Sequence, residues 1–338
     1  NGIGVLVADS PFGPFKDPIG KPLVWRQEHW SDIDPAIWID DDGQAYMYWG
    51  NPHTYCVRLN EDMISTKGEI MQMDPIGDYQ EGPWFWSRKN ARGEKWYYLA
   101  YASTCCPEGI GYAMSKSPIG PWEHKGHIMD HTPRTRGNHP GIIDFKGKSY
   151  CFGLTYDIFR LESSRHAERR CCMAAEMTYN ADGTIQELPY FQDCKLEQVG
   201  TFNPFRRVEA ETMAWGYGLK TTRENPSGPW NPTLFVTDID DGEYILVKGV
   251  DFGKGAKELL VSCSAQMFGG TMEIRLDAPD GWKAGSIDVP NTKFKYETFR
   301  TALTKCSGVH DLYFVFKSNS MQKKNLFNFD WWEAKACR

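Results

Sequence analysis

The chain has 338 residues, a formal net charge of -6 and 24% charged residues. It contains no apolar run long enough for a transmembrane helix and no basic stripe, so we expect a soluble protein with neither a membrane span nor a nucleic-acid partner. Aromatic residues make up 14% of the chain and include 13 tryptophans. This content suits stacking on sugar rings, but it equally suits the packing of a β-rich core.

The ten cysteines include two adjacent pairs, Cys105-Cys106 and Cys171-Cys172. Such pairs do not resemble the framework of a small disulfide-rich protein. A few bridges in an exported protein remain compatible with the sequence, which does not indicate their pairing. Asn1 is not an initiator residue, so we expect a mature or trimmed product whose export signal lay upstream, and hence a secreted or extracellular protein of bacterial type.

The first predicted element is an apolar strand at 3–15 that ends in Ser-Pro-Phe-Gly-Pro-Phe, and a similar pattern returns at 110–122. Three predicted hairpins, each with an apolar strand, a polar turn and a second strand, occupy 34–50, 83–101 and 140–153. The hairpins begin about 50 residues apart, which is close to the length of a propeller blade. We predict three blades, preceded by the outer part of another, so that the chain begins partway through a blade.

The repeat stops between about residues 191 and 206, and a different pattern runs to the end of the chain. It consists of short alternating strands between Gly and Pro turns, such as 244–247, 259–262, 272–276 and 311–316. Strands of this kind at regular spacing predict a β-sandwich. We therefore expect an all-β chain with a partial propeller at 1–203 and a β-sandwich at 204–338.

Two carboxylates occupy equivalent places near the Pro that opens a predicted hairpin, namely Asp34 and Glu81. In a propeller both would point to the central axis from neighbouring blades. Carboxylates in one pocket can differ in protonation, as the acid and base of glycoside hydrolysis must. The alternative is that Asp-Pro and Glu-Gly-Pro are turn sequences, as the run at 40–43, Asp-Asp-Asp-Gly, is expected to be.

His139 precedes the third hairpin and would also reach the axis. It could coordinate a metal, hold a water-bound ion at the pore or orient substrate, whereas a lone histidine is also a common structural residue. Arg169 and Arg170 could contact sugar hydroxyls or an active carboxylate, or they could be solvated surface charges.

In the second domain, Glu209 and Glu211 lie at the first strand and Asp330 near the last. Because first and last strands commonly pair, these carboxylates could meet and bind Ca²⁺, which prefers six to eight oxygen ligands. An aromatic and amide platform for sugar could form from Trp215, Tyr217, Trp230 and Asn328. Core packing is the alternative role for the tryptophans near the C-terminus, Trp331 and Trp332.

With these motifs the chain resembles glycoside hydrolase family 43 followed by a family 6 carbohydrate-binding module. The resemblance rests on three sequences in the same order as in the family: residues 31–43, Gln80-Glu81-Gly82-Pro83 and Asn138-His139-Pro140-Gly141. Residues 208–211 and 325–331 resemble the opening and closing strands of the module. The resemblance implies a five-bladed propeller that acts on arabinose- or xylose-containing polysaccharides with inversion.

By the same resemblance Glu81 is the general acid, while Asp34 tunes the pKa of that acid and orients the substrate. His139 lies at the pore ion, and Arg170 falls near a substrate-contacting arginine. Structural calcium is implied at the module carboxylates, Glu209, Glu211 and Asp330.

One part of the family pattern has no match. Family 43 enzymes carry the general base, an Asp, in their first blade, upstream of the motifs seen here. Asp9 and Asp17 lie in an outer-strand context and are poor substitutes. We expect the first one or two blades to be supplied by a separate N-terminal polypeptide or to be absent from the sequence as printed, since three blades and a fragment cannot close a ring.

The leading hypothesis is therefore an inverting glycosidase that releases arabinofuranosyl or xylosyl units from arabinoxylan, xylan or their oligosaccharides, provided that the general base is supplied. The alternative is a non-catalytic xylan-binding protein in which the partial propeller is inert.

Overall fold

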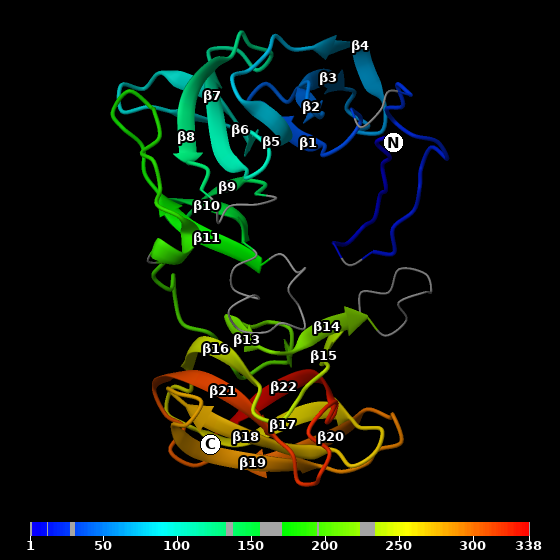
Figure 1. The fold of residues 1–338 in the computed structure, drawn as a ribbon, viewed down its shortest axis with the longest axis vertical. Helices are drawn as coiled ribbons and strands as arrows, with labels where there is room; N and C mark the ends of the chain where they lie inside the picture. The colour runs from blue at the N-terminus through cyan, green and yellow to red at the C-terminus, as the bar shows by residue number, and fades with distance from the viewer. Residues whose placement is uncertain are drawn as a thin grey trace. The chain divides into compact units, whose positions relative to one another are not determined.

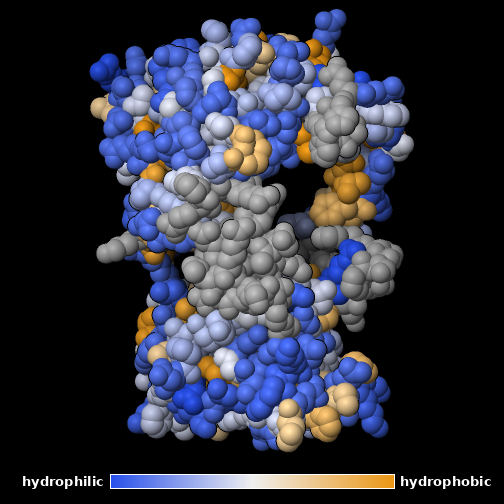
Figure 2. Space-filling model, viewed as in Figure 1, coloured by the Kyte–Doolittle hydropathy of each residue, from blue (hydrophilic) through white to orange (hydrophobic). Residues whose placement is uncertain are grey.

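The computed structural model describes residues 2–11, 13–27, 31–132, 138–155, 171–194, 196–223 and 234–337. These residues form β-strands and one 3-10 turn, η2 (Phe191–Asp193), with no α-helix among them. They divide into two compact units, which we call the propeller unit (within residues 1–196) and the module (within residues 197–338) (Figure 1). In the described part of the chain, no helix has the length and apolar character needed to cross a membrane. Both units show mostly hydrophilic residues on the face in Figure 2.

The first blade is a four-stranded antiparallel sheet with the strands in sequence order. Its strands are β1 (Ala36–Ile39), β2 (Ala45–Trp49), β3 (Tyr55–Leu59) and β4 (Thr66–Gln72). The aspartate run between β1 and β2 is a turn, as expected, and the Gly43 N–H donates to the Asp40 carbonyl at 2.9 Å. Gly43 has a φ of +83°, a value that favours glycine.

The second blade has the same arrangement. Its strands are β5 (Tyr79–Lys89), β6 (Lys95–Ser103), β7 (Gly109–Ser115) and β8 (Glu123–Met129). The pattern at 110–122 therefore covers a third strand and the turn into the outermost one. The third sheet pairs β9 (Gly141–Phe145), β10 (Lys148–Thr155) and β11 (Cys171–Met177) in the order β9-β10-β11. All three predicted hairpins are confirmed.

The earlier copy of that pattern, at 3–15, does not form a strand of a sheet. The described residues between 3 and 24 make two isolated bridges, between Ile3 and Val24 and between Val7 and Lys16, and belong to no sheet. Ile3 and Val24 pack against the buried side of the first blade beside Met47 and Trp49. Three other large apolar residues of this copy, Leu6, Val7 and Phe15, are 61%, 43% and 45% exposed.

The inner strands β1, β5 and β9 lie next to one another at the centre of the propeller unit. Trp38 of β1 contacts Phe85 of β5, with ring centroids 5.7 Å apart. The Trp84 indole N–H donates to the Ile142 carbonyl of β9 at 2.9 Å. Residues that precede or open these three strands are therefore brought together, whatever their separation in sequence.

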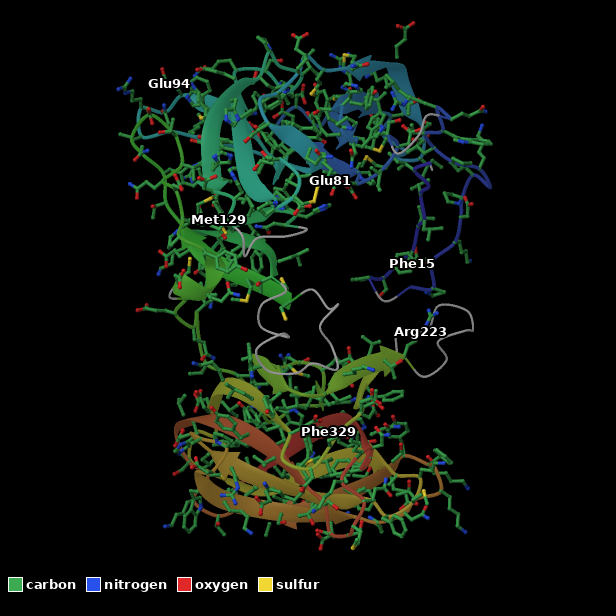
Figure 3. All side chains as sticks on the ribbon, in the orientation of Figure 1. Phe15, Glu81, Glu94, Met129, Arg223 and Phe329 are labelled. Carbon is green, nitrogen blue, oxygen red and sulfur yellow. A yellow bond between two sulfur atoms is a disulfide. The ribbon has the colours of Figure 1, made fainter. Side chains whose placement is uncertain are left out.

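The module is a two-sheet β-sandwich. One sheet has the order β14-β15-β22-β17-β20, with β12 also on β22, and the other has the order β13-β16-β21-β18-β19. The strands are β12 (Val208–Glu209), β13 (Trp215–Tyr217), β14 (Lys220–Arg223), β15 (Leu234–Thr237), β16 (Tyr244–Asp251), β17 (Ala256–Ser264), β18 (Gly270–Leu276), β19 (Trp282–Val289), β20 (Glu297–Ala302), β21 (Val309–Lys317) and β22 (Asn328–Ala336). One buried cluster fills the space between the sheets and includes Phe314, Phe329 and Trp332 (Figure 3). The predicted fold class, all-β with propeller blades followed by a sandwich, is confirmed.

Candidate active site

Asp34, Glu81 and His139 meet at the openings of the three inner strands. Asp34 lies two residues before β1, Glu81 is the third residue of β5, and His139 lies two residues before β9. One potential ligand atom from each lies within 4.8 Å of the others, and all three side chains are half-buried. The structure thus brings together the three residues that the blade pattern singles out.

Glu81 is aimed by a local irregularity of its own strand. The pairing of β5 with β6 shifts register both between Tyr79 and Glu81 and between Glu81 and Trp84. Such bulges re-aim a side chain that regular pleating would direct elsewhere. Gly82 follows with a φ of +60°, and a Cβ there would lie 2.7 Å from the His139 ring, so a glycine is required for both reasons.

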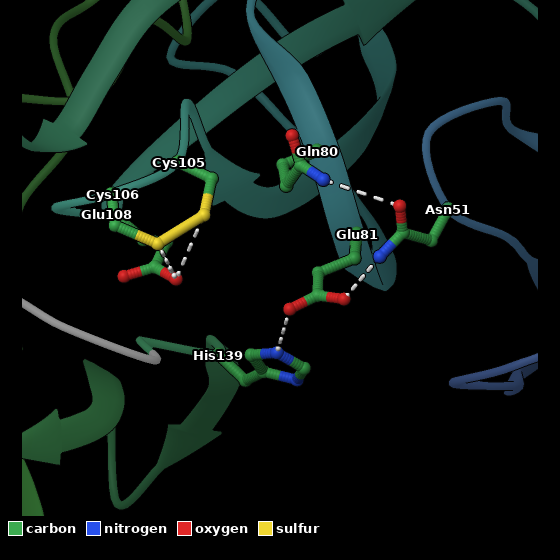
Figure 4. Close-up of a disulfide and its surroundings, with 7 residues drawn as sticks. All are labelled: Asn51, Gln80, Glu81, Cys105, Cys106, Glu108 and His139. Carbon is green, nitrogen blue, oxygen red and sulfur yellow. Dashed lines mark hydrogen bonds and ion pairs between the residues drawn. A yellow bond between two sulfur atoms is a disulfide. The ribbon is translucent and has the colours of Figure 1, made fainter. Parts of the chain in front are cut away.

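Both oxygens of the Glu81 carboxyl have partners (Figure 4). The Asn51 amide donates to Oε2 at 2.5 Å, and His139 Nε2 lies 3.1 Å from Oε1. Gln80 in turn donates to Asn51 Oδ1 at 3.2 Å. Asn51 and Gln80 were missed by the sequence reasoning. Their one available signal is position, since Asn51 follows β2 by two residues and Gln80 directly precedes Glu81.

The backbone around Asp34 is fixed by hydrogen bonds to the chain that follows β2. Its φ of +57° is in the left-handed region, which Asp tolerates better than most residues. The Gly50 N–H donates to the Ile33 carbonyl at 3.1 Å, and the Tyr79 hydroxyl donates to the Gly50 carbonyl at 2.8 Å. Burial raises the pKa of Tyr79, and the nearby Asp34 and Glu81 charges add to that shift. The Tyr79 hydroxyl therefore stays protonated and keeps its hydrogen bond to the Gly50 carbonyl.

A pocket of about 360 Å³ opens at these residues. Its lining is Asp34, Pro35, Ala36, Ile37, Gly82, Pro83, Trp84, Phe85, His139 and Pro140. The Trp84 side chain is 40% exposed and was not among the predicted site residues. A concave site with an aromatic wall and a few convergent polar groups is the usual form of a small-molecule pocket.

Two other aspartates of this region have structural roles. Asp32, 2% exposed, accepts from the Arg26 side chain at 2.8 Å and from Trp49 at 3.1 Å. Burial would raise the pKa of Asp32, but the hydrogen bonds from Arg26 and Trp49 outweigh burial and lower it. Asp17 accepts from the backbone N–H groups of residues 19 and 20 and forms a turn. Arg169 and Arg170 lie outside the described residues, as does Trp230.

The first and last strands of the module pair as expected, with Glu209 of β12 opposite Trp331 of β22. Arg207 makes two bonds to the Glu209 carboxyl, at 2.8 and 3.0 Å, and lies 3.8 Å from Asp330. Glu211 Oε2 is buried without a hydrogen-bond partner among the described residues. Burial raises the pKa of Glu211, and the charges of Glu209 and Asp330 raise it further. The three predicted carboxylates are therefore close enough to repel one another.

The predicted aromatic platform is divided between the two sheets. Trp215 and Tyr217 lie on β13 at the edge of the five-stranded sheet, where Tyr217 stacks on Tyr244 at 5.4 Å. Asn328 begins β22 in the other sheet, and its Oδ1 accepts from Thr237 at 2.8 Å. The separation follows from the sheet order, because β13 pairs with β16 in one sheet and β22 pairs with β17 in the other.

A different aromatic pair lies near Asn328. Phe235 of β15 and Tyr296, which precedes β20, have ring centroids 5.8 Å apart. In the sheet Ser264 pairs with Asn328, and its neighbour Cys263 pairs with Glu297. Continued by one residue, the antiparallel pairing places Tyr296 beside Ser264. Tyr296 and Asn328 are therefore expected on the same face of the sheet. The sequence reasoning missed both rings, because their proximity depends on pairing across β17.

Two protein family models match the chain. The model for glycosyl hydrolases family 43 matches residues 1–185, which include Asp34, Glu81 and His139, and the model for a family 6 carbohydrate-binding module matches residues 209–336. This chain belongs to glycosyl hydrolases family 43. Its enzyme class is that of the family's glycosidases, the arabinofuranosidase and xylosidase type, with a family 6 module attached.

Relatives of this family 43 chain match along its whole length. An arabinoxylan arabinofuranohydrolase of Bacillus subtilis is 33% identical over 98% of this chain and 70% of its own length, and one of Paenibacillus polymyxa is 32% identical over 98% and 56%. A crystal structure of a family 43 arabinoxylan arabinofuranohydrolase from Bacillus subtilis, in complex with cellotetraose, superposes with a TM-score of 0.83 at 31% identity. That match covers 99% of this chain and 74% of the solved one.

Proposed function

We propose that this family 43 chain acts in an inverting glycosidase that releases arabinofuranosyl, or alternatively xylosyl, units from arabinoxylan, xylan or their oligosaccharides. The observation that carries the proposal is the meeting of Asp34, Glu81 and His139 in one pocket that has Trp84 in its wall. The names of the two relatives, both arabinoxylan arabinofuranohydrolases, support arabinoxylan as the substrate.

Glu81 is the proposed general acid, which protonates the leaving glycosidic oxygen. The Asn51 Nδ2 group can only donate, so Glu81 Oε2, 2.5 Å away, is an acceptor. The proton of the acid form then belongs on Oε1, the oxygen nearer His139. Asp34 keeps a negative charge close by, which disfavours ionisation of Glu81 and so preserves the acid.

The carboxylate that activates water is expected from the family resemblance to lie upstream of Asp34. Neither Asp17, which forms a turn, nor Asp32, which is paired with Arg26, is suited to the task. The identity of the general base therefore stays a prediction.

The ion expected at His139 fits the described residues only in part. A cation bound directly between His139 and Glu81 would hold Glu81 deprotonated and remove the acid. We therefore propose that His139 orients Glu81 and the substrate. An ion held through water molecules at the pore stays a prediction.

In the module we propose a structural calcium ion at Glu209, Glu211 and Asp330. The donor types suit Ca²⁺, because all are carboxylate oxygens and Glu211 Oε2 is buried with no hydrogen-bond donor among the described residues. The three carboxylates do not form a cluster with ligand atoms within 4.8 Å of one another in the described structure, and Glu209 is bonded to Arg207, so binding the ion requires these side chains to move together. The ion would offset part of the repulsion that acts on Glu211. We propose further that the aromatic pair Phe235 and Tyr296, together with Asn328, contacts the polysaccharide.

We also propose that the protein acts outside the cell. A polymeric arabinoxylan substrate is too large to be taken up intact, and the bonded pair of Cys105 and Cys106 suits an oxidising compartment.

The proposal is tested by Glu81→Gln in the complete protein, with Glu94→Gln as the matched control. Glu94 belongs to the same hairpin, far along the strands from the pocket, and its carboxyl accepts from the nearby Asn90 amide at 2.7 Å (Figure 3). We expect hydrolysis of unactivated arabinoxylan oligosaccharides to fall by about 10²- to 10⁴-fold in the first variant, with a smaller loss for substrates that have good leaving groups. The control should keep full activity.

Undiminished hydrolysis of substrates with poor leaving groups by the Glu81→Gln variant would contradict the proposal that Glu81 is the general acid. Xylan binding without any turnover by the wild-type complete protein would instead favour the non-catalytic alternative.

A further inference from the structure

The adjacent cysteines of the β6–β7 loop are joined to each other. Cys105 and Cys106 form a disulfide, and both residues are exposed. The proposed catalytic steps use neither of them. Figure 4 shows the pair in the surroundings of Glu81 and His139, on the opposite side of Glu81 from Asn51.

The sheet register places this loop at the catalytic end of the blade. Ser103 at the end of β6 pairs with Tyr79 at the start of β5, and Ala102 pairs with Glu81. The Thr104 N–H donates to the Asp78 carbonyl at 2.8 Å, which extends the pairing beyond the strand. The residues that follow, 105–108, therefore leave the sheet beside the opening of β5, where Glu81 lies.

A buried carboxylate lies behind the disulfide. Glu108 is 5% exposed, and its Oε1 lies 3.6 Å from Cys105 Sγ and 3.4 Å from Cys106 Sγ. Glu108 is buried and both cysteine residues are exposed, so the disulfide lies at the surface with Glu108 against its sulfurs. The bond also removes the rotamer freedom of both side chains, so a ligand that rests on them does not have to order them.

We propose that the Cys105–Cys106 disulfide is a substrate-contacting surface, on which the xylose chain beyond the cleaved arabinose rests through its C–H faces. Disulfide sulfur is polarisable and offers no hydrogen-bond donor, so it suits an apolar sugar face. The residues that line the pocket do not include either cysteine. In this proposal the disulfide contacts a part of the substrate that lies outside the pocket. This inference rests on the proposed function and adds the element that distinguishes a branched oligosaccharide from a single sugar.

The experiment measures how fast a phosphine reductant opens this bond in the Glu81→Gln variant of the complete protein, which cleaves the probe too slowly to consume it, by alkylation and mass spectrometry of the peptide that contains both cysteines. The probe is xylotetraose with one arabinofuranosyl branch. At ten times its Kd it should slow the opening by about tenfold, because only the free protein exposes the bond. L-Arabinose at ten times its own Kd should fill the pocket and give no protection.

Two readouts make the result decisive. Pocket occupancy is followed by ¹⁹F NMR of fluorotryptophan-labelled protein, in which Trp84 is assigned with Trp84→Phe. Alkylation of Cys337, an exposed free thiol at the far end of β22 from Asn328, should be unchanged by either sugar and controls for reagent depletion.

A shift of the Trp84 resonance by the branched oligosaccharide, with unchanged opening of the disulfide, would overturn the inference and leave the proposed function standing. Absence of both responses would show that the propeller unit does not bind the substrate, and would contradict the proposed function together with this inference. Protection by L-arabinose alone would also overturn it, because it would place the disulfide at the pocket itself.

Discussion

The two units of this protein build their interiors differently. The described residues of the propeller unit contain three separate buried clusters, and these are rich in tyrosine. The module has a single buried cluster that contains no tyrosine among its described residues. In the propeller unit, buried hydroxyls donate to backbone carbonyls of loops, as Tyr48 does to Pro118 and Tyr98 to Gly183, each at 2.8 Å.

This difference follows from where each core lies. A sandwich encloses its core between two sheets whose backbone groups are already paired, so apolar side chains suffice. A propeller packs sheet against sheet around an axis, and its cores touch the loops that leave each blade. Tyrosine supplies both ring area and a donor for such loops. The same arrangement brings polar strand openings together at the axis, and there Asp34, Glu81 and His139 meet.

The largest effect on stability is expected from removing a fully buried ring of the module, that of Trp332. Trp332 is 0% exposed and its ring lies 5.4 Å from that of Phe314. Trp332→Ala should cost about 3–5 kcal/mol of unfolding free energy through lost burial and a cavity. Tyr48→Phe in the propeller unit, which removes only a hydroxyl, should cost about 1 kcal/mol. Urea unfolding monitored for each unit tests this order, and a larger loss for Tyr48→Phe would contradict the contrast between the two cores.

The next effect concerns the close approach of backbone and imidazole at the propeller axis. In Gly82→Ala the new Cβ would lie 2.7 Å from His139 Nδ1, at a φ of +60°. We expect a loss of about 1–3 kcal/mol and weaker binding of arabinoxylan oligosaccharides, since His139 must move. Gly93→Ala is the matched control, because Gly93 has a φ of +78° with nothing within 4 Å of its Cβ position. Equal losses in binding for both variants would show that contact with His139 is unimportant.

A third prediction concerns the carboxylates of the module. Burial raises the pKa of Glu211, and the charges of Glu209 and Asp330 add to the shift. Without a cation, Glu211 binds its proton more tightly in the folded module than in the unfolded chain. Its stability should therefore fall as pH rises above the ordinary value of about 4.3. Calcium at 100 times its Kd should add about 2.7 kcal/mol at neutral pH.

Thermal unfolding with chelator or calcium at several pH values measures both effects. Glu211→Gln should abolish most of the calcium response, while Glu297→Gln on the exposed side of β20 should leave it intact. A wild-type midpoint that is insensitive to chelator would contradict a structural calcium ion.

The smallest effect is expected at the pair that His127 forms with Asp78 in the second blade. His127 Nε2 lies 2.7 Å from Asp78, and this hydrogen bond raises the pKa of His127. Burial opposes the shift, while the charges of Asp130 and Glu187 add to it. The resulting stability is fully present below the ordinary histidine pKa of about 6.5 and is lost as pH rises through the raised pKa. His124 and His131 also face His127, with ring centroids 6.0 and 6.3 Å away.

His127→Gln should therefore destabilise the propeller unit by about 0.5 kcal/mol at pH 5.5 and by less at pH 8.5. NMR titration of His127, with Asp78→Asn as the control, checks the assignment. A pKa that does not fall in Asp78→Asn would contradict it.

Several features were predictable because they depend on neighbours in the chain. The hairpins, the aspartate turn and the short strands of the module all follow from alternation of apolar residues and from turn sequences. The convergence of Asp34 and Glu81 was also predictable, because it requires only that repeated units share a geometry. By contrast, in the described part of the strand expected at 3–15 there are two isolated bridges and no sheet pairing, since a strand needs a partner that a local pattern does not specify.

By itself, then, the sequence determined the two units, the order of the blades and the three residues at their inner strand openings, because repetition and periodicity are local properties. Only the tertiary structure decided what surrounds them. The bulges about Glu81, the Asn51 bond to its carboxyl and the position of the Cys105–Cys106 bond near it depend on register between strands. The Phe235 and Tyr296 pair likewise depends on pairing across β17. Register is set by packing over the whole sheet, which no short stretch of sequence contains.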